Sequence, residues 1–206
     1  MELVNFDEAK SLLAKYKVSC PKTAFCVTQE EAEKVAESFG YPVFLKIYGK
    51  NILHRTEEKG VGEATDKGGL AKMFSEMKKI SGVEGVLVQE KAMGKSLIVG
   101  MKRDPQFGPV IMVGIGGIFT EILKDFVLRV APVSESNAME MMAELKGYDY
   151  LCGKRDKEPI NFKETAKIIS AISDLSMKES NILQIDLNPV ISDSKKSLAV
   201  DFKFLI

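Results

Sequence analysis

The chain has 206 residues, of which 45% are hydrophobic and 28% charged, and 29 basic residues balance 29 acidic ones. This composition is that of a globular protein with enough chain to bury a core in one large domain or two lobes. The zero net charge gives no sign of general polyanion binding, so we expect no nucleic-acid partner. The longest apolar stretch, Val110–Phe119, is too short to cross a bilayer, so we expect no membrane partner either.

The cysteine and histidine content limits the chemistry further. Cys20, Cys26 and Cys152 are widely spaced and odd in number, which argues against a disulfide framework and favours a reducing compartment, the cytoplasm. The one histidine, His54, excludes any site on this chain that needs two histidines.

Helices and strands alternate in the first part of the chain. Capping residues, glycine stops and β-branched runs predict helices at 7–16, 28–40 and 66–82, and strands at 42–48 and 86–89.

In the second part, strand patterns cluster before helical ones. We expect strands at 97–101, 110–114, 127–131, 182–187 and 198–204, helices at 136–146 and 161–177, and a turn at Asn188–Pro189. No long linker interrupts the chain. The pattern therefore predicts a single α+β domain over residues 1–206, with a first lobe at 1–88 and a second at 89–206.

Lys46 is a charged residue inside an apolar strand pattern. One interpretation is a side chain that points to solvent, because alternate residues of a strand face outward. The other is a lysine held on a rigid strand and directed at a phosphate.

His54 lies in a segment with Arg55, Thr56 and two nearby glycines. Such a loop is able to hold phosphate through main-chain N–H groups and cations, although it lacks the P-loop pattern. Taken alone, a histidine in such a segment is more often a surface residue than a catalyst. Gly116 and Gly117 follow an expected strand, where glycine permits a tight turn or close approach of a ligand.

Hard oxygen donors stand among apolar residues near the C-terminal end: Asp186, Asn188 and Asp201. Mg²⁺ held by one or two such side chains together with nucleotide phosphates suits this set. The alternative is that Asp186 and Asn188 point outward from an edge strand and that Asn188–Pro189 is only a turn.

At these residues the chain resembles the β subunit, or ATP-grasp domain, of archaeal NDP-forming acyl-CoA synthetases (acetate–CoA ligase, ADP-forming). The resemblance runs from about Thr28 to the C-terminal end. Its most specific part is the run Leu97–Met112, and the shorter motifs lie at 40–46, 52–54, 88–90, 116–119, 186–190 and 199–201.

The resemblance implies an ATP-grasp fold, in which two α/β lobes hold a nucleotide between them. It implies the reaction acyl-CoA + ADP + phosphate ⇌ carboxylic acid + ATP + CoA, with ATP or ADP and Mg²⁺ as cofactors and phosphohistidines as carriers. Lys46, Glu90 and the Gly116–Gly117 turn would contact the nucleotide, and Asn188 and Asp201 would hold Mg²⁺. Asp186 would support the metal or the arriving phosphohistidine, and His54 would be the phosphoryl carrier on this chain.

Three residues depart from the family pattern. Lys59 replaces a glycine after the histidine, Ser96 replaces a glutamate linked to a ribose contact, and Gln184 replaces a glutamate before Asp186. The alternative function is therefore a regulatory or non-catalytic nucleotide-binding ATP-grasp module. A carboxylate–amine ligase of the same fold is a third interpretation, but it gives His54 no role.

The resemblance also implies a partner, because the reaction needs a CoA-binding α subunit that carries a first phosphohistidine. We expect a hetero-oligomer such as α2β2. The partner's histidine loop is expected to dock near Asp186 and the Gly116–Gly117 turn, on a surface of this chain that includes an apolar patch.

Overall fold

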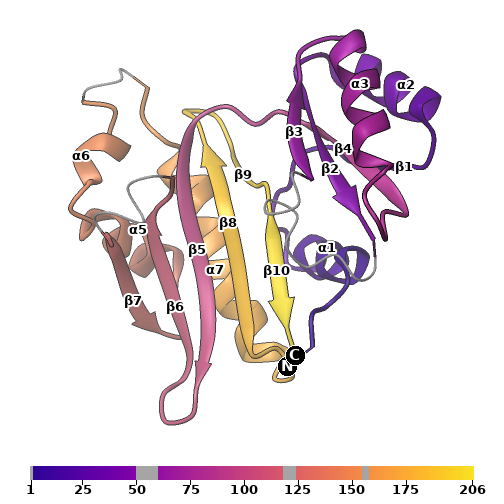
Figure 1. Cartoon of the computed structure of the whole chain (residues 1–206). Helices are drawn as coiled ribbons and strands as arrows, with labels where there is room; N and C mark the ends of the chain where they lie inside the picture. The colour runs from indigo at the N-terminus through magenta and orange to yellow at the C-terminus, as the bar shows by residue number, and fades with distance from the viewer. Residues whose placement is uncertain (1, 50–59, 118–123, 155–157) are drawn as a thin grey trace. The chain divides into compact units, whose positions relative to one another are not determined.

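The computed structural model describes residues 2–49, 60–117, 124–154 and 158–206, which fall into two compact units (Figure 1). The smaller unit is Pro21–Lys91. The larger unit contains the residues up to Cys20 together with Ala92–Ile206. Among the described residues, none of the helices combines the length and apolarity needed to cross a bilayer.

The smaller unit is a four-stranded antiparallel sheet with two helices. Its strands lie in the order β1-β4-β2-β3. Its elements in chain order are β1 (Thr23–Cys26), α2 (Gln29–Phe39), β2 (Val43–Tyr48), β3 (Val61–Ala64), α3 (Lys67–Met77) and β4 (Gly85–Glu90).

Side-chain caps set the starts of both helices in this unit. The Thr28 hydroxyl accepts from the main-chain N–H of Glu31, whose carboxylate accepts in return from Thr28 N–H, so α2 begins with a capping box as predicted. Asp66 caps α3 by accepting from Gly69 N–H at 2.7 Å. Leu70, Phe74 and Met77 of α3 pack in the core of the unit.

The larger unit is built on an antiparallel sheet in the order β10-β8-β5-β6-β7, with β9 paired to β8. Its elements in chain order are α1 (Phe6–Lys15), β5 (Lys95–Asp104), β6 (Gly108–Ile115), β7 (Phe126–Val130), α5 (Glu135–Ala143), α6 (Tyr148–Leu151), α7 (Phe162–Lys178), β8 (Gln184–Ser192), β9 (Ser197–Ala199) and β10 (Phe202–Leu205).

Helices α5 and α7 cover one face of this sheet, behind the strands in Figure 1. The apolar stripe expected on α7, which includes Ile169, Ile172 and Leu175, is fully buried against inward-facing strand residues such as Val113 and Leu187. We call the opposite face of the sheet the outer face. Strand residues alternate between the two faces, so the polar residues of β8 lie on the outer one.

The observed units differ from the expected lobes at the N-terminal end. Residues 1–20 were expected in the first lobe, but they belong to the larger unit. The physical reason is pairing and packing: Val4 N–H donates to Phe204 O at 2.9 Å, and α1 packs against β10.

Two short strands and one turn also differ from expectation. β1 and β3 have four residues each and were not predicted. The turn expected at Asn188–Pro189 is wrong, because both residues lie inside β8, which continues to Ser192 and pairs with β9. The edge-strand interpretation of Asp186 and Asn188 is also wrong, since β8 lies between β10 and β5.

Candidate active site

Asp186, Asn188 and Asp201 come together on the outer face of the large sheet. Ile185 and Leu187 are buried in the core, so alternation turns Asp186 and Asn188 outward. Asp201 directly precedes β10, and its carbonyl accepts from Asn188 N–H at 3.1 Å. Asn188 and Asp201 are therefore cross-strand neighbours, whose Cβ atoms are typically about 5 Å apart.

The Asp186 carboxyl is half-buried among these groups. Burial raises its pKa above the usual value; the positive charge of Lys203 opposes this rise, and the negative charge of Asp201 adds to it. Lys203 lies directly opposite Asp186 in the β8–β10 pairing. The site thus combines two carboxylates, one amide and one ammonium group on two adjacent strands.

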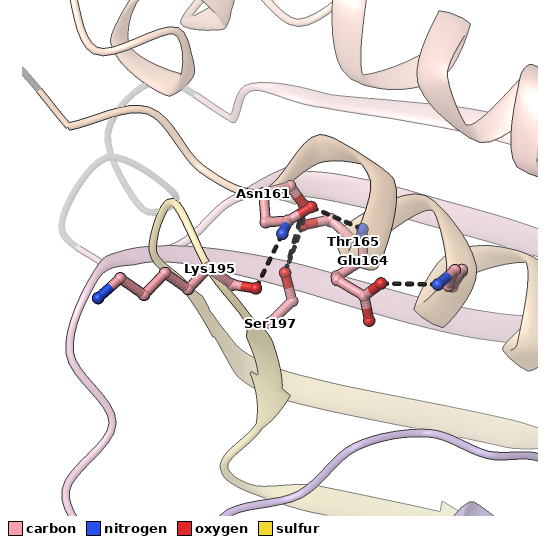
Figure 2. A network of polar contacts seen from close by, with 6 residues as sticks. Asn161, Glu164, Thr165, Lys195 and Ser197 are labelled. Atoms are coloured by element: carbon pink, nitrogen blue, oxygen red, sulfur yellow. Dashed lines mark hydrogen bonds and ion pairs between the residues drawn. The ribbon is translucent and has the colours of Figure 1, made fainter.

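A hydroxyl network joins the turn between β8 and β9, at the end of the strand that carries Asp186 and Asn188, to the start of α7 (Figure 2). The Asn161 side chain caps α7 and donates to the carbonyl of Lys195 at 2.9 Å. The Thr165 and Ser197 hydroxyls lie 2.9 Å apart, and the Ser197 and Ser192 hydroxyls 2.8 Å apart. Because Thr165, Ser192 and Ser197 are at most 2% exposed, these bonds fix the hairpin strongly.

The donor set fits Mg²⁺ that is completed by phosphate oxygens. An Asn amide oxygen and an Asp carboxylate are hard ligands, and Mg²⁺ in nucleotide sites commonly uses one or two protein ligands plus phosphates. Within the described parts of the chain there is no cluster of three or more His, Cys, Asp or Glu residues able to hold a metal alone. Asn188 and Asp201 would supply only two protein ligands, so phosphate oxygens and water would complete the coordination shell of a bound Mg²⁺.

Lys46 belongs to the smaller unit and is 5% exposed. It lies in β2, opposite Val61 on one side and Leu87 on the other. The interpretation of Lys46 as a solvent-facing strand residue is wrong. A buried lysine needs anionic or polar partners, because desolvating an ammonium group is costly.

Glu90 ends β4 in the same unit and is half-buried. Its main-chain N–H donates to Lys22 O at 2.9 Å, and its carboxylate accepts weakly from Lys22 N–H at 3.4 Å. Glu90 pairs with Val43, three positions along β2 from Lys46. The two residues thus lie on neighbouring strands without being opposite each other.

Gly116 and Gly117 have separate structural explanations. Gly116 N–H donates to Ser96 O at 2.8 Å, and a Cβ on Gly116 would lie 3.0 Å from the Ser96 Cβ and closer still to its hydroxyl. Gly117 has a φ of +77°, which favours glycine. Close packing of β6 on β5 therefore accounts for Gly116 without a ligand.

His54, Lys59 and the loop around them lie outside the described residues, so their predicted roles stay predictions. Lys203 was missed at the sequence level. The signal that identifies it is the alternation in Asp201–Phe202–Lys203–Phe204, because buried Phe202 and Phe204 put Asp201 and Lys203 on the other face.

Comparison with known proteins identifies the family. The sequence model of the ATP-grasp domain family matches residues 2–206. The chain is 36% identical to the acetate–CoA ligase [ADP-forming] I subunit beta of Pyrococcus furiosus, over 97% of this chain and 90% of that protein. It is 38% identical to the acetate–CoA ligase [ADP-forming] I of Archaeoglobus fulgidus, over 97% of this chain but only 30% of that longer protein.

A solved structure agrees with these relatives. The dinucleotide-forming acetyl-coenzyme A synthetase 1 of Ca. Korarchaeum cryptofilum, in complex with coenzyme A and Mg-AMPPCP, superposes with a TM-score of 0.85 at 30% identity. The match covers 99% of this chain and 92% of the solved chain. The solved complex is described with a phosphohistidine segment pointing towards the nucleotide binding site. The predicted α+β ATP-grasp fold and the predicted ligase relationship are confirmed. The chain belongs to the ATP-grasp family and, within it, to the β subunits of ADP-forming acetate–CoA ligases.

Proposed function

We propose that this chain is the nucleotide-binding β subunit of an ADP-forming acyl-CoA synthetase. The reaction is acyl-CoA + ADP + phosphate ⇌ carboxylic acid + ATP + CoA. The observation that carries the proposal is the pairing of Asn188 with Asp201 beside Asp186 on a sheet face of an ATP-grasp chain. This arrangement supplies hard ligands where phosphates and a divalent cation are to be held.

Each site residue has a role in this proposal. Lys46 binds the nucleotide phosphates, and Glu90 binds the adenine–ribose part. The Gly116–Gly117 turn lines the nucleotide site. His54 accepts the phosphoryl group from the partner's phosphohistidine: a bond from phosphorus to a His54 nitrogen forms as the bond to the partner's histidine nitrogen breaks. An ADP phosphate oxygen then takes the phosphoryl group as the bond from phosphorus to His54 breaks.

Asn188 and Asp201 are the residues that would hold Mg²⁺. The ion, when bound, neutralises charge on the nucleotide phosphates during transfer. Asp186 holds the arriving histidine through a hydrogen bond from the imidazole N–H to its carboxylate. Lys203, opposite Asp186, favours the ionised form of that carboxylate.

The chain acts with a CoA-binding α subunit in this proposal. Relatives occur as a separately named β subunit and as a longer chain of which this region is 30%. The α subunit carries the first phosphohistidine, and an α2β2 assembly in the cytoplasm is the expected form. Residues 1–206 form one ATP-grasp domain, of which the two compact units are the lobes.

A regulatory module without turnover is the less favoured alternative. Lys46, Asn188 and Asp201 are all retained, and the relatives over the full chain are named as ligases or ligase subunits. A carboxylate–amine ligase finds no support in those names.

Reconstitution tests the proposal. The purified chain is assayed for ATP formation from acetyl-CoA, ADP and phosphate, alone and with the α-type CoA-binding subunit of the same organism. We expect activity only in the mixture, at about 1–1000 per second as is typical of enzymes. ATP formation by the isolated chain would contradict the proposal. So would a chain that binds nucleotide but supports no ATP formation with any partner subunit.

A further inference from the structure

The outer face of the large sheet is polar at β8 and β10 and apolar at β7. Rows of paired residues run across the strands from one side to the other. One row runs across four strands: Asp186 of β8 pairs with Gly100 of β5, Gly100 with Met112 of β6, and Met112 with Leu128 of β7. Neighbouring strands lie about 4.8 Å apart, so Leu128 is roughly 14 Å from Asp186 along this row. Gly100 has no side chain, and the Met112 side chain fills that space: its Cε would lie 3.3 Å from a Cβ on Gly100. Met112 therefore extends the apolar half toward Asp186.

The apolar half ends in three exposed side chains on β7. Phe126, Leu128 and Val130 are 49%, 52% and 46% exposed, and we call them the β7 strip. The intervening residues face the helices: Val127 packs against the core, and Arg129 pairs with Glu144. Apolar residues at every exposed position of one strand make a contiguous patch, which is a usual mark of an interaction surface.

The direction of the side chains limits what covers this patch. Ile115 N–H donates to Asp125 O, and Ala131 N–H donates to Pro109 O. These two bonds show that Asp125 and Ala131 direct their main-chain groups toward β6. Alternate residues of an antiparallel strand do the opposite, so the main-chain N–H and C=O groups of Phe126, Leu128 and Val130 point away from β6. Among the described residues no strand pairs with that edge. A second copy added edge to edge would satisfy those groups but leave the side chains on the outer face exposed, because side chains stand perpendicular to a sheet.

We propose that the β7 strip is the docking surface for the CoA-binding partner subunit, which lies over the outer face and brings its phosphohistidine along the Leu128–Met112–Gly100 row to Asp186. This inference rests on the proposed function, in which a histidine on another chain must reach Asp186. A partner subunit that lies over the outer face would cover the β7 strip and extend to Asp186 within a single interface. Obligate interfaces are more apolar than the rest of a protein surface, as the strip is.

The test compares two substitutions of equally exposed residues. Leu128→Lys places a charge in the strip, and Met177→Lys places one on α7, where Met177 is also 52% exposed but lies on the helix layer. Affinity for the CoA-binding subunit that restores ATP formation is measured by titration calorimetry. We expect Leu128→Lys to weaken binding at least about tenfold, as for a central interface residue, and Met177→Lys to leave it unchanged. Leu128→Thr, which keeps a strand-forming residue, should weaken binding in the same direction if Leu128→Lys fails to fold.

Other outcomes overturn the inference. Unchanged partner affinity in both Leu128 variants would do so. A wild-type dimer that becomes a monomer in Leu128→Lys, with partner affinity unchanged, would assign the strip to a second copy. The two failures are distinguishable. If the proposed function is wrong, the wild-type chain gives no ATP formation with any partner. If only the inference is wrong, the Leu128 variants still support ATP formation with the partner.

Discussion

The main-chain N–H of Asn188 donates to the carbonyl oxygen of Asp201 at 3.1 Å. This bond joins β8 to the start of β10 and sets an amide and a carboxylate next to each other on the outer face. Asp186 and Lys203 form the next cross-strand pair on the same face. Four polar side chains thus occupy adjacent positions on two strands, and strand pairing alone fixes their spacing.

Removal of a charged group from the candidate site should reduce turnover strongly. We expect Lys46→Ala and Asp201→Asn each to lower the reconstituted rate at least about 100-fold, the scale of losing one group that stabilises charge in the transition state. Lys72→Ala, at an exposed lysine of α3, is the control and should keep the wild-type rate. Near-wild-type rates in both site variants would reject the assignment.

Arg103 should stabilise the end of α7. Its guanidinium donates to the carbonyls of Ser176 at 2.7 Å, Ile182 at 3.2 Å and Glu179 at 3.3 Å. We expect Arg103→Met to lower the free energy of unfolding by about 2–3 kcal/mol, since several charge-assisted bonds are lost.

The control for Arg103 is a second arginine in the same unit. Arg129 makes an ion pair with Glu144, and both side chains are more than a third exposed. Arg129→Met should therefore cost less than about 1 kcal/mol. Urea unfolding of the two variants checks this prediction, and equal losses would contradict it.

Gly116 should be required for packing of β6 on β5. A Cβ at Gly116 would press on the main chain and side chain of Ser96, so Gly116→Ala should lower the free energy of unfolding by about 1–3 kcal/mol. Ser96→Gly in the same chain should recover part of the loss, because it removes the nearest atoms. A double-mutant cycle with no coupling between the two positions would show that the close approach is not the cause.

Two thiols should resist alkylation in the folded chain. Burial raises the pKa of Cys20 and Cys26 to about 11. A thiol with that pKa stays protonated as the pH rises to 8, with roughly one molecule in a thousand as thiolate, and the thiolate is the reactive form. Iodoacetamide at pH 8, followed by mass spectrometry, should leave both residues unmodified and should modify them in concentrated guanidinium chloride. Rapid modification of either in the folded chain would contradict the prediction.

Local signals in the sequence predicted the helices better than the short strands. Thr28 and Asp66 marked helix starts correctly because capping is a contact between residues three positions apart. β1 and β3 are too short to show a period, and their existence depends on pairing with β4 and β2. Asn188 and Pro189 are typical turn residues, but both lie inside β8, at a register shift against β5. Asn188 N–H donates to Asp201 O there, and Val200 N–H donates to Pro189 O, so contacts with the last part of the chain override the turn preference.

The candidate site was predictable in composition but only partly in geometry. Alternation in Asp186–Leu187–Asn188 indicated a shared face, whereas the position of Lys203 opposite Asp186 depends on the β8–β10 register. Lys46 was ambiguous, because a single strand pattern does not say what covers its second face, and the structure resolves this by burying it.

In the proposed function, this chain carries phosphoryl groups on His54 between a partner and the nucleotide. The direct measurement is incubation of the purified chain with Mg²⁺ and ATP labelled in the γ-phosphate, followed by acid and base treatment. We expect an acid-labile, base-stable label that is absent in His54→Asn, since an imidazole nitrogen is the nucleophile. Label that persists in His54→Asn, or label on serine or threonine, would contradict it.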